Sequence, residues 1–488
     1  MSVQSADPQN LTVHQLSAEL RSRRLSSSEL VNTLLDRIAT HDRKLHAFVA
    51  LYADEARLAA KAADTAIRAG HAVGPLHGIP IALKDLVEIE GRVTTGGSKV
   101  WQDRLSTTTA TLVRKVKAAG MIVIGKTHSV EFAMGGWGTN QYMGTPWNPW
   151  DLKTPLTPGG SSSGSGVAVA ARLVPCAIGT DTGGSVRLPA SWCGIVGLKA
   201  TVGRISTYGI LPLAPTLDTP GPMTRSVEDA AILFNILQGF DPLDDRTSGR
   251  SAADPIPSLR RGVAGLRLAV LPEGERTGLD QKVLSAYDDS VEVLRGLGAE
   301  IVSFDLPRKF SDFAELTGQI IGAEGYTAVG DIVDRLDLPV DDAVRPRIWI
   351  GKSMSARDYL RALAEREKLT RQFAGVFANI DALLTPTTAT PPIPIASVDQ
   401  SRSPAVFTRM VNLLDLCALS LPNGFTAAGL PTSLQIVCRG YDEGLALRIG
   451  WAYEHVVDWL TRVPPDVLAR CLIPGVRSAL RGEADMNR

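Results

Sequence analysis

Apolar residues near the start of the chain recur at helical spacing in two segments. Ser26-x-x-Glu29 has the pattern of a capping box, which opens a helix by satisfying its first backbone N–H groups. The apolar positions after it share one helix face: Leu30, Val31, Leu34, Leu35 and Ile38. A second, alanine-rich helix is predicted over about 54–69, and Gly70 directly after it is typical of a helix end in the left-handed conformation.

Short runs of consecutive apolar residues then predict buried strands. Residues 79–83 (IPIAL) form the first strand, with Lys84 and Asp85 at its exit. Residues 109–119 have the pattern of a helix that stops at Gly120, and residues 121–124 that of the next strand. An alternation of strand, helix and strand is typical of an α/β sheet that contains parallel strand pairs.

The stretch 159–189 (GGSSSGSGVAVAARLVPCAIGTDTGGSVRLP) places a Ser/Gly run at each end of a small apolar middle. We predict a helix over 166–173, whose small side chains indicate close packing, and a strand over 176–180. A proline-rich loop, 146–158, leads into the first run. Serines among glycines suit close approach by a reacting group, because glycine lets backbone N–H groups crowd a ligand.

The second half of the chain repeats this rhythm after a polar surface connection over about 240–261. The predicted elements are strands over 266–271 and 300–304, a helix over 280–297, an extended segment over 382–395, two strands within 419–438 and a helix from Glu443. A helical subregion is expected at about 305–375. We see no internal repeat and predict one large α/β domain over 1–488, with its core at about 70–230 and residues 376–488 completing the sheet.

Composition excludes several classes of protein. Of 488 residues, 44% are hydrophobic, and 51 basic residues balance 51 acidic ones, so no basic surface for nucleic acid is indicated. No secretory signal is visible, and the longest apolar run, 166–179, contains Arg172 and is too short for a membrane span. The five cysteines are scattered and odd in number, which favours reduced thiols in a cytoplasmic protein.

Two sequence motifs of known enzymes occur in the chain, but the elements predicted around them do not fit those motifs. Residues 120–127 satisfy the P-loop pattern, yet the MIVI between the glycines favours a core strand over a phosphate-binding loop. Residues 160–164 match the G-x-S-x-G elbow, yet no strand enters it and the only downstream histidine is His455. The histidines form no metal-binding motif, and no G-x-G-x-x-G is present. We therefore expect neither a metal nor another cofactor.

Serine chemistry without histidine requires another base, and Lys84 is placed to supply it. Burial lowers the pKa of a lysine so that neutral amine exists near neutral pH, although a lone lysine at a strand end more often extends to solvent. In the second run, two adjacent glycines before Ser185 can turn several N–H groups toward one point, as an oxyanion hole requires. A tight turn with a solvent-exposed serine would use the same residues.

Residues 159–190 resemble the amidase signature family, whose members are Ser–cis-Ser–Lys hydrolases. The match runs from Gly159-Gly-Ser-Ser-Ser-Gly through Gly179-x-Asp-x-Gly-x-Ser185 to Val186-Arg-x-Pro189. Further segments are similar to the family: GPLHGIPIALKD (74–85), EFAMG (131–135), NPWD (148–151), LDTPGPM (217–223) and LSLPNGF (419–425). The resemblance implies an α/β fold, a single large domain in which a central mixed, twisted β-sheet is covered by helices on both faces.

Carried over residue by residue, the resemblance implies a catalytic triad. Ser185 would be the nucleophile, Ser161 the bridging serine that follows a cis peptide bond from Gly160, and Lys84 the base. Neutral Lys84 would draw the proton of Ser161, which draws that of Ser185, and Ser185 would then attack the substrate carbonyl.

The same resemblance implies an oxyanion hole formed by the N–H groups of Thr182, Gly183, Gly184 and Ser185. Asp181 and Arg187 would support that loop. The substrate-side loop of the family corresponds to Met134, Gly135, Gly136 and Trp137.

Aromatic and soft apolar residues concentrate near this site, which favours a pocket for aryl or alkyl amides. They are Phe132, Met134, Trp137, Tyr142, Trp147, Trp150 and Trp192. Core packing explains Trp147, Trp150 and Trp192 better than a pocket does. Trp137, between glycines, is the strongest candidate for the pocket wall.

Three functions stay open. The first is an amidohydrolase that cleaves neutral amides, with carbamates (a urethanase activity) or esters as alternative substrates of the same triad. The second is the glutamine-hydrolysing subunit of a tRNA-dependent amidotransferase, which would need partner subunits. The third, a non-catalytic protein, is disfavoured by the intact Lys84, Ser161 and Ser185. We expect a small-molecule amide or carbamate substrate and no nucleic-acid or membrane partner, and a homodimer stays open.

Overall fold

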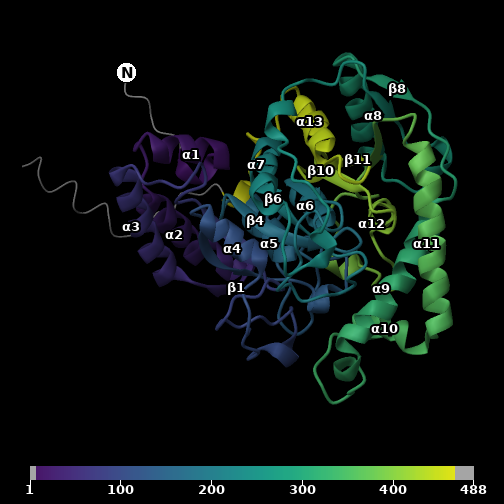
Figure 1. Ribbon diagram of the computed structural model, residues 1–488, viewed down its shortest axis with the longest axis horizontal. Helices are drawn as coiled ribbons and strands as arrows, with labels where there is room; N and C mark the ends of the chain where they lie inside the picture. The colour runs from purple at the N-terminus through teal and green to yellow at the C-terminus, as the bar shows by residue number, and fades with distance from the viewer. Residues whose placement is uncertain (1–6, 468–488) are drawn as a thin grey trace, which may run out of the picture.

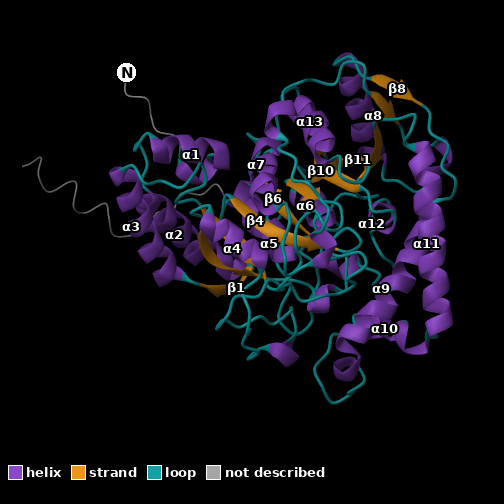
Figure 2. Ribbon diagram, in the orientation of Figure 1, coloured by secondary structure: helices purple, strands orange, loops and turns teal. Residues whose placement is uncertain are grey.

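A single sheet of eleven strands runs through the part of the chain that the computed structural model describes, residues 7–467 (Figures 1 and 2). Its strand order is β1-β3-β2-β4-β6-β5-β10-β11-β9-β7-β8. The strands are β1 (Phe48–Leu51), β2 (Pro80–Lys84), β3 (Ile122–Thr127), β4 (Cys176–Asp181), β5 (Val196–Lys199), β6 (Thr219–Thr224), β7 (Arg267–Ala269), β8 (Glu300–Val302), β9 (Ala382–Pro386), β10 (Cys417–Phe425) and β11 (Pro431–Cys438).

Helices surround this sheet. They are α1 (Val13–Arg21), α2 (Ser27–Leu45), α3 (Ala53–Ala69), α4 (Thr111–Ala118), α5 (Ser163–Ala170), α6 (Arg187–Cys193), α7 (Val227–Leu237), α8 (Gln281–Gly296), α9 (Phe310–Val333), α10 (Arg345–Trp349), α11 (Ala356–Val376), α12 (Arg409–Leu413) and α13 (Glu443–Glu454). Helices α1 to α3 lie at one end of the molecule, and α8 to α11 at the other (Figure 1). No helix among the described residues combines the length and apolar character that crossing a membrane demands.

Local sequence explains where several helices begin and end. The Ser26 side chain accepts from Glu29 N and the Glu29 carboxylate accepts from Ser26 N, so the predicted capping box opens α2. Gly70 ends α3 in the left-handed conformation, as predicted. The glycine at 120 has φ +79° between α4 and β3, so the P-loop match is a helix stop followed by a core strand.

The sheet is mixed, as predicted. Strand pairs β2–β3, β2–β4, β7–β8 and β7–β9 are parallel, and the remaining pairs are antiparallel. Because β3 and β4 flank β2 on both sides, the last residue of β2 lies deep in the molecule. This last residue is Lys84.

The two faces of the sheet differ in polarity at β10 and β11. Gly450 of α13 lies against Leu419 and Leu421, which point to one face. Side chains alternate along a strand, so Ser420 and its cross-strand partner Gln435 point to the other face, where Arg187 of α6 binds Gln435. Helices therefore cover both faces, and the predicted fold class is confirmed. The face with buried polar residues is the one that carries the site.

The structure deviates from the predicted elements in several places, and strands β1, β5 and β6 were not predicted. Helix α5 begins at Ser163, three residues earlier than expected, so part of the first Ser/Gly run is helical. The connection at 240–261 lies mostly at the surface, as predicted, although Asp241, Asp244 and Thr247 within it are buried and hydrogen-bonded. A turn that caps itself with Asp and Thr side chains can be polar in sequence and still be buried.

Strands β5 and β6 lie so close together that a larger residue at Gly221 should destabilise the sheet. A Cβ atom at Gly221 would overlap the backbone carbonyl of Leu198. Gly221→Ala should therefore lower the free energy of unfolding by about 1–3 kcal/mol or more, measured by urea denaturation.

Gly375 of α11 is the matched control, because a Cβ there meets nothing within 4 Å. Gly375→Ala should leave stability unchanged or raise it by up to about 1 kcal/mol through helix propensity. Equal stability of the two variants would contradict the packing described for β5 and β6.

Candidate active site

Lys84, Ser161 and Ser185 come from three separate elements that meet at one edge of the sheet. Lys84 ends β2, Ser161 precedes α5, and Ser185 lies in the turn between β4 and α6. Strands β2 and β4 are parallel neighbours, so their carboxyl ends lie at the same edge. Such an edge is where open α/β sheets usually bind ligands.

Lys84 is fully buried and contacts hydroxyl groups. Its Nζ lies 2.7 Å from Ser161 Oγ and 2.8 Å from Thr180 Oγ1, with an exposure of 0%. Burial lowers the pKa of Lys84 to about 7, against the weaker opposing effects of Asp218 and Asp181. A substantial fraction of this lysine is therefore neutral at physiological pH and able to accept a proton.

Backbone contacts bring the two Ser/Gly runs together. The peptide bond from Gly160 to Ser161 is cis, as the resemblance implies. Ser162 N donates to the carbonyl of Ser185 at 3.2 Å, and Ser162 Oγ donates to that of Thr180 at 3.2 Å. The first run is thus held directly against the turn that contains Ser185.

Four backbone N–H groups, of residues 182–185, were predicted to form the oxyanion hole, and the structure differs from this prediction at one of them. Gly184 N donates to Asp181 Oδ1 at 2.8 Å, so this N–H group is already occupied. Among residues 7–467, the N–H groups of Thr182, Gly183 and Ser185 have no hydrogen-bond acceptor. Three of the four predicted donors are therefore available to an oxyanion, and Gly184 supports the turn instead.

Glycine is required at position 184. Its φ of +134° is rarely open to other residues. A Cβ atom there would also overlap Thr408 Oγ1, which donates to the carbonyl of Gly183 at 2.7 Å. The turn is therefore fixed both by its own conformation and by the segment before α12.

Asp181 and Arg187 form a fully buried ion pair beneath this turn. Arg187 Nη2 and Nε donate to the two oxygens of Asp181 at 2.9 and 3.0 Å, and both side chains have an exposure of 0%. The carboxylate also accepts from Val186 N at 3.1 Å. Although burial opposes it, the charge of Arg187 holds the pKa of Asp181 well below its usual range.

Residues from the C-terminal part of the chain complete this cluster, and the sequence did not reveal them. Arg187 donates to Asn412 Oδ1 at 2.6 Å, to Gln435 Oε1 at 2.7 Å and to the Thr408 carbonyl at 3.0 Å. Asn412 in turn donates to Asp181 Oδ1 at 2.9 Å. The available signal was Gln435, an amide side chain between the apolar Leu434 and Ile436 of β11.

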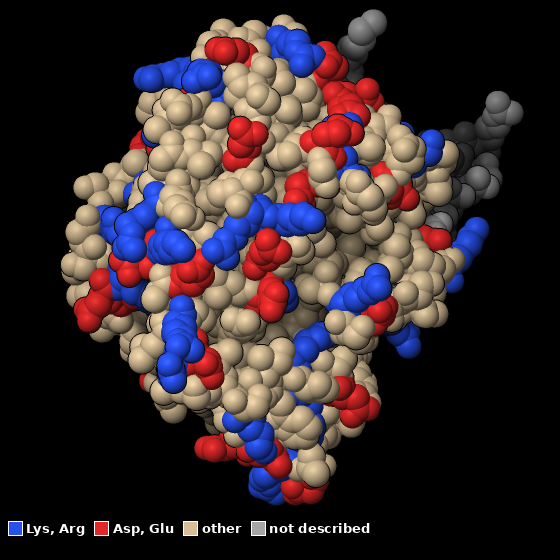
Figure 3. Space-filling view, turned by 90° about the vertical axis from the view of Figure 1, so that its right-hand side faces the viewer, with Lys and Arg blue, Asp and Glu red and all other residues tan. Residues whose placement is uncertain are grey.

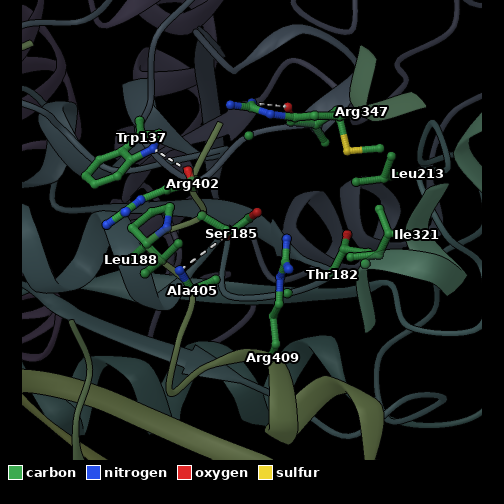
Figure 4. A pocket seen from close by; sticks show the side chains of 18 of the residues that line it. Trp137, Thr182, Ser185, Leu188, Leu213, Ile321, Arg347, Arg402, Ala405 and Arg409 are labelled. Carbon is green, nitrogen blue, oxygen red and sulfur yellow. Dashed lines mark hydrogen bonds between the residues drawn. The ribbon is translucent and has the colours of Figure 1, made fainter. Parts of the chain in front are cut away.

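Ser185 opens on a cavity of about 280 Å³. Its wall includes Met134, Gly135, Gly136 and Trp137, the loop predicted to line the pocket. Thr182, Gly183 and Ser185 lie at its base, while α9 and the segment 401–405 close the other sides. Figure 4 shows Trp137 and Leu188 on one side of Ser185 and Leu213 and Ile321 on the other.

Trp137 is held in the wall by two contacts. Its ring stacks on Trp192, with ring centroids 5.3 Å apart, and its Nε1 donates to the Arg402 carbonyl at 2.9 Å. Trp192 itself is buried behind it. The remaining aromatic candidates do not line this cavity: Trp147 lies beneath Lys44, and Trp150 packs on Phe425.

The sequence also missed the basic side chains of this cavity. Arg347 of α10 and Arg409 of α12 approach it from opposite sides (Figure 4). They lie far from Ser185 in sequence and belong to short helices without a motif. A pocket predicted to be apolar is therefore partly cationic.

The remaining residue types that often bind ligands are not gathered at the site within the described part of the chain. No cluster of histidine, cysteine and acidic residues suited to a metal ion occurs within residues 7–467. Four cysteines are buried and unpaired, and Cys471 lies outside the described residues. On the face shown in Figure 3, Lys and Arg are interspersed with Asp and Glu.

Comparison with known proteins finds relatives along nearly the whole chain. A family model described as Amidase matches residues 29–447. A glutamyl-tRNA(Gln) amidotransferase subunit from Geobacter metallireducens is 38% identical, over 93% of this chain and 98% of the relative.

Two solved structures are also similar. The native peptide amidase from Stenotrophomonas maltophilia superimposes with a TM-score of 0.82 at 30% identity, covering 91% of this chain and 96% of that one. A bacterial aryl acylamidase of the amidase signature family gives a TM-score of 0.83 at 26% identity, with 92% and 96% covered.

The buried ion pair makes a testable prediction about stability. Asp181→Ala leaves the Arg187 charge buried without its counterion, so the free energy of unfolding should fall by about 3–5 kcal/mol in urea denaturation. The control is Glu367→Ala, which removes an exposed partner of Arg371 on α11 and should change little. Similar losses in both variants would show that the cluster is not the support described above.

Proposed function

The chain belongs to the amidase signature family, as its motifs predicted, and we propose that it hydrolyses small amides through an acyl-enzyme formed on Ser185. The observation that carries this proposal is the contact of a buried lysine, with a pKa of about 7, with Ser161 Oγ at 2.7 Å. A neutral amine is the base that serine chemistry without histidine requires.

In the proposed first step, Lys84 accepts the proton of Ser161 while Ser161 accepts that of Ser185. The Ser185 oxygen then attacks the carbonyl carbon of a substrate in the cavity. Negative charge develops on the carbonyl oxygen and is stabilised by the unoccupied N–H groups of Thr182, Gly183 and Ser185. Fixed donors of this kind provide a large share of the rate enhancement in acyl transfer.

In the second step, the proton returns through Ser161 to the leaving nitrogen, and the C–N bond breaks. Water then attacks the acyl-enzyme by the reverse relay, which releases the acid and restores Ser185. Carbamates and esters differ only in the groups attached to the carbonyl, so the same residues would act on them. Asp181 and Arg187 hold the turn and do not touch the reacting atoms.

A second candidate is favoured by the curated relatives. Their names make them subunits of glutamyl-tRNA(Gln) amidotransferase, and the identity of 38% extends over nearly the whole chain. In that function the same triad would release ammonia from glutamine, and partner subunits would use it. The peptide amidase and aryl acylamidase neighbours favour the stand-alone amidase.

Removing either serine of the triad tests the mechanism. Ser185→Ala and Ser161→Ala should each lower kcat/KM for amides by about a thousandfold or more. Ser163 is the matched control: it is buried beside them, but its Oγ has no hydrogen-bond partner among the described residues. Ser163→Ala should keep its activity, and a Ser185→Ala variant that also kept it would refute the assignment.

The pKa of Lys84 predicts a pH profile. The neutral amine is the active form, so kcat/KM should rise as pH increases through about 7 and level off above it. Lys84→Met should abolish the activity at every pH. A rate that stayed flat from pH 6 to 9 would contradict a lysine base.

An assay of the purified chain without partner subunits distinguishes the two candidate functions. We expect it to turn over small amides by itself, measured as product release from aliphatic amides, anilides, aryl carbamates and glutamine. If glutamine were the one substrate hydrolysed, and only after an amidotransferase partner subunit is added, the result would favour the glutamine-hydrolysing subunit.

A further inference from the structure

Two arginines of the cavity have no carboxylate partner among residues 7–467. Arg409 Nη1 donates to the Ala314 carbonyl at 2.8 Å. Arg347 donates to the Met134 carbonyl at 3.1 Å and to the Gln400 side-chain oxygen at 2.8 Å. All of these acceptors are neutral, so no ion pair balances either charge, and burying such charges is costly.

The other arginines near the site are neutralised. Arg187 is paired with Asp181 below the turn. Arg402, at the mouth of the cavity, has a side-chain exposure of 83% and lies 3.4 Å from Asp399. Arg347 and Arg409 therefore stand out as positive charges that face the cavity without a counterion.

Both groups stay charged at neutral pH. Burial, with a further contribution from the charge of Arg347, lowers the pKa of Arg409 to about 10. Burial also lowers the pKa of Arg347, which Asp341 partly opposes. The carboxylate of Asp341 accepts from the backbone N–H groups of Gln141 and Ala343 and does not line the cavity.

We propose that the substrate is a small amide that carries a carboxylate, bound by Arg409 and Arg347, and that carries no ammonium group. This inference rests on the proposed function, because the cavity is the substrate site only if Ser185 is the nucleophile. A guanidinium group matches a carboxylate in shape and in donors. No aspartate or glutamate is among the described residues that line the cavity, so no carboxylate of the lining would balance the charge of an ammonium group.

The position of Arg409 places the carboxylate close to the reacting carbonyl. A Cβ atom at Gly183 would lie 3.4 Å from Arg409 Cγ and 3.8 Å from its Nε, so the arginine passes directly over the proposed oxyanion turn. The walls beside it are apolar and include Leu213, Ile321 and Ile350. They suit a short hydrocarbon spacer between the amide and the carboxylate.

The size of the cavity agrees with a short spacer. Its volume of about 280 Å³ accommodates a small amide with a short spacer. Glutaramate, a five-carbon monoamide, is an example.

The test uses three amides with five carbons each. Glutaramate has the carboxylate, pentanamide replaces it with a methyl group, and L-glutamine adds an ammonium group to glutaramate. Two further pairs vary the length of the spacer between amide and carboxylate. They are succinamate with butanamide, which have four carbons, and adipamate with hexanamide, which have six. We expect kcat/KM for the preferred carboxylate amide to exceed that of its neutral partner by about tenfold or more, and glutaramate to exceed glutamine.

Variants assign this preference to Arg409. In Arg409→Gln, the ratio of kcat/KM for the carboxylate amide to that for its neutral partner should fall toward one, and Arg409→Lys should keep part of it. Arg371→Gln removes an exposed positive charge on α11 and should leave the ratio unchanged. A neutral partner hydrolysed equally well in every pair, or a ratio that survives Arg409→Gln, would overturn the inference.

Binding separates this inference from the proposed function. The Ser185→Ala variant, titrated calorimetrically with the same amides, should bind the carboxylate amides more tightly than their neutral partners, and the added change Arg409→Gln should abolish the difference. Such binding without any hydrolysis by the native chain would refute the proposed function but support the carboxylate site. Hydrolysis of neutral amides without a binding preference for the carboxylate amides would support the proposed function but refute the carboxylate site.

Discussion

The exclusion of water from Lys84 is the constraint on which the rest of the site depends. Moving a lysine pKa from 10.5 to about 7 corresponds to about 5 kcal/mol in favour of the neutral amine. Lys126, on the next strand, offers a comparison: burial lowers its pKa as well, and the charge of Asp85 opposes that shift. Lys126 is equally buried, but its Nζ lies 3.3 Å from Asp85 Oδ1 and forms a structural ion pair. Lys84 contacts hydroxyl groups instead, and no carboxylate of the described residues lies within salt-bridge distance to stabilise its charged form.

The acidic groups near Lys84 are occupied elsewhere. Asp181 is paired with Arg187, and Asp218 accepts from Thr182 Oγ1 at 2.5 Å and from the N–H groups of residues 213 and 214. The carboxylates of Asp181 and Asp218 thus each hold a part of the cavity floor or wall. Because they are bound there, the same interactions shape the pocket and leave Lys84 without an ion-pair partner. In the proposed function, Lys84 acts as the base from behind the cavity, whereas Arg347 and Arg409 line the cavity. Proton transfer and charge recognition are then carried out by different groups.

Much of the fold followed from local patterns, because capping residues, glycine stops and apolar runs act over a few positions. The segment that carries Ser161 and Ser185 could be found because its chemistry lies within about thirty residues. Arg347, Arg409, Asn412 and Gln435 could not be assigned in this way. They come from distant elements, and only the order of strands in the sheet and the packing of α9, α10 and α12 bring them to the site. The occupied N–H group of Gly184 depends on side-chain geometry that sequence does not contain.

The ion-pair cluster around Arg187 also has a consequence for biosynthesis. The turn that contains Ser185 is made in the first half of translation, but it is held by Gln435, which is 248 residues further along the chain than Arg187. At about 5–20 residues per second, a ribosome needs roughly 12 to 50 s to cover that distance. A nascent chain therefore carries the two serines of the proposed triad long before the residues that fix them have been made. Hydrolytic activity would begin only near the end of synthesis, when strands β10 and β11 have joined the sheet.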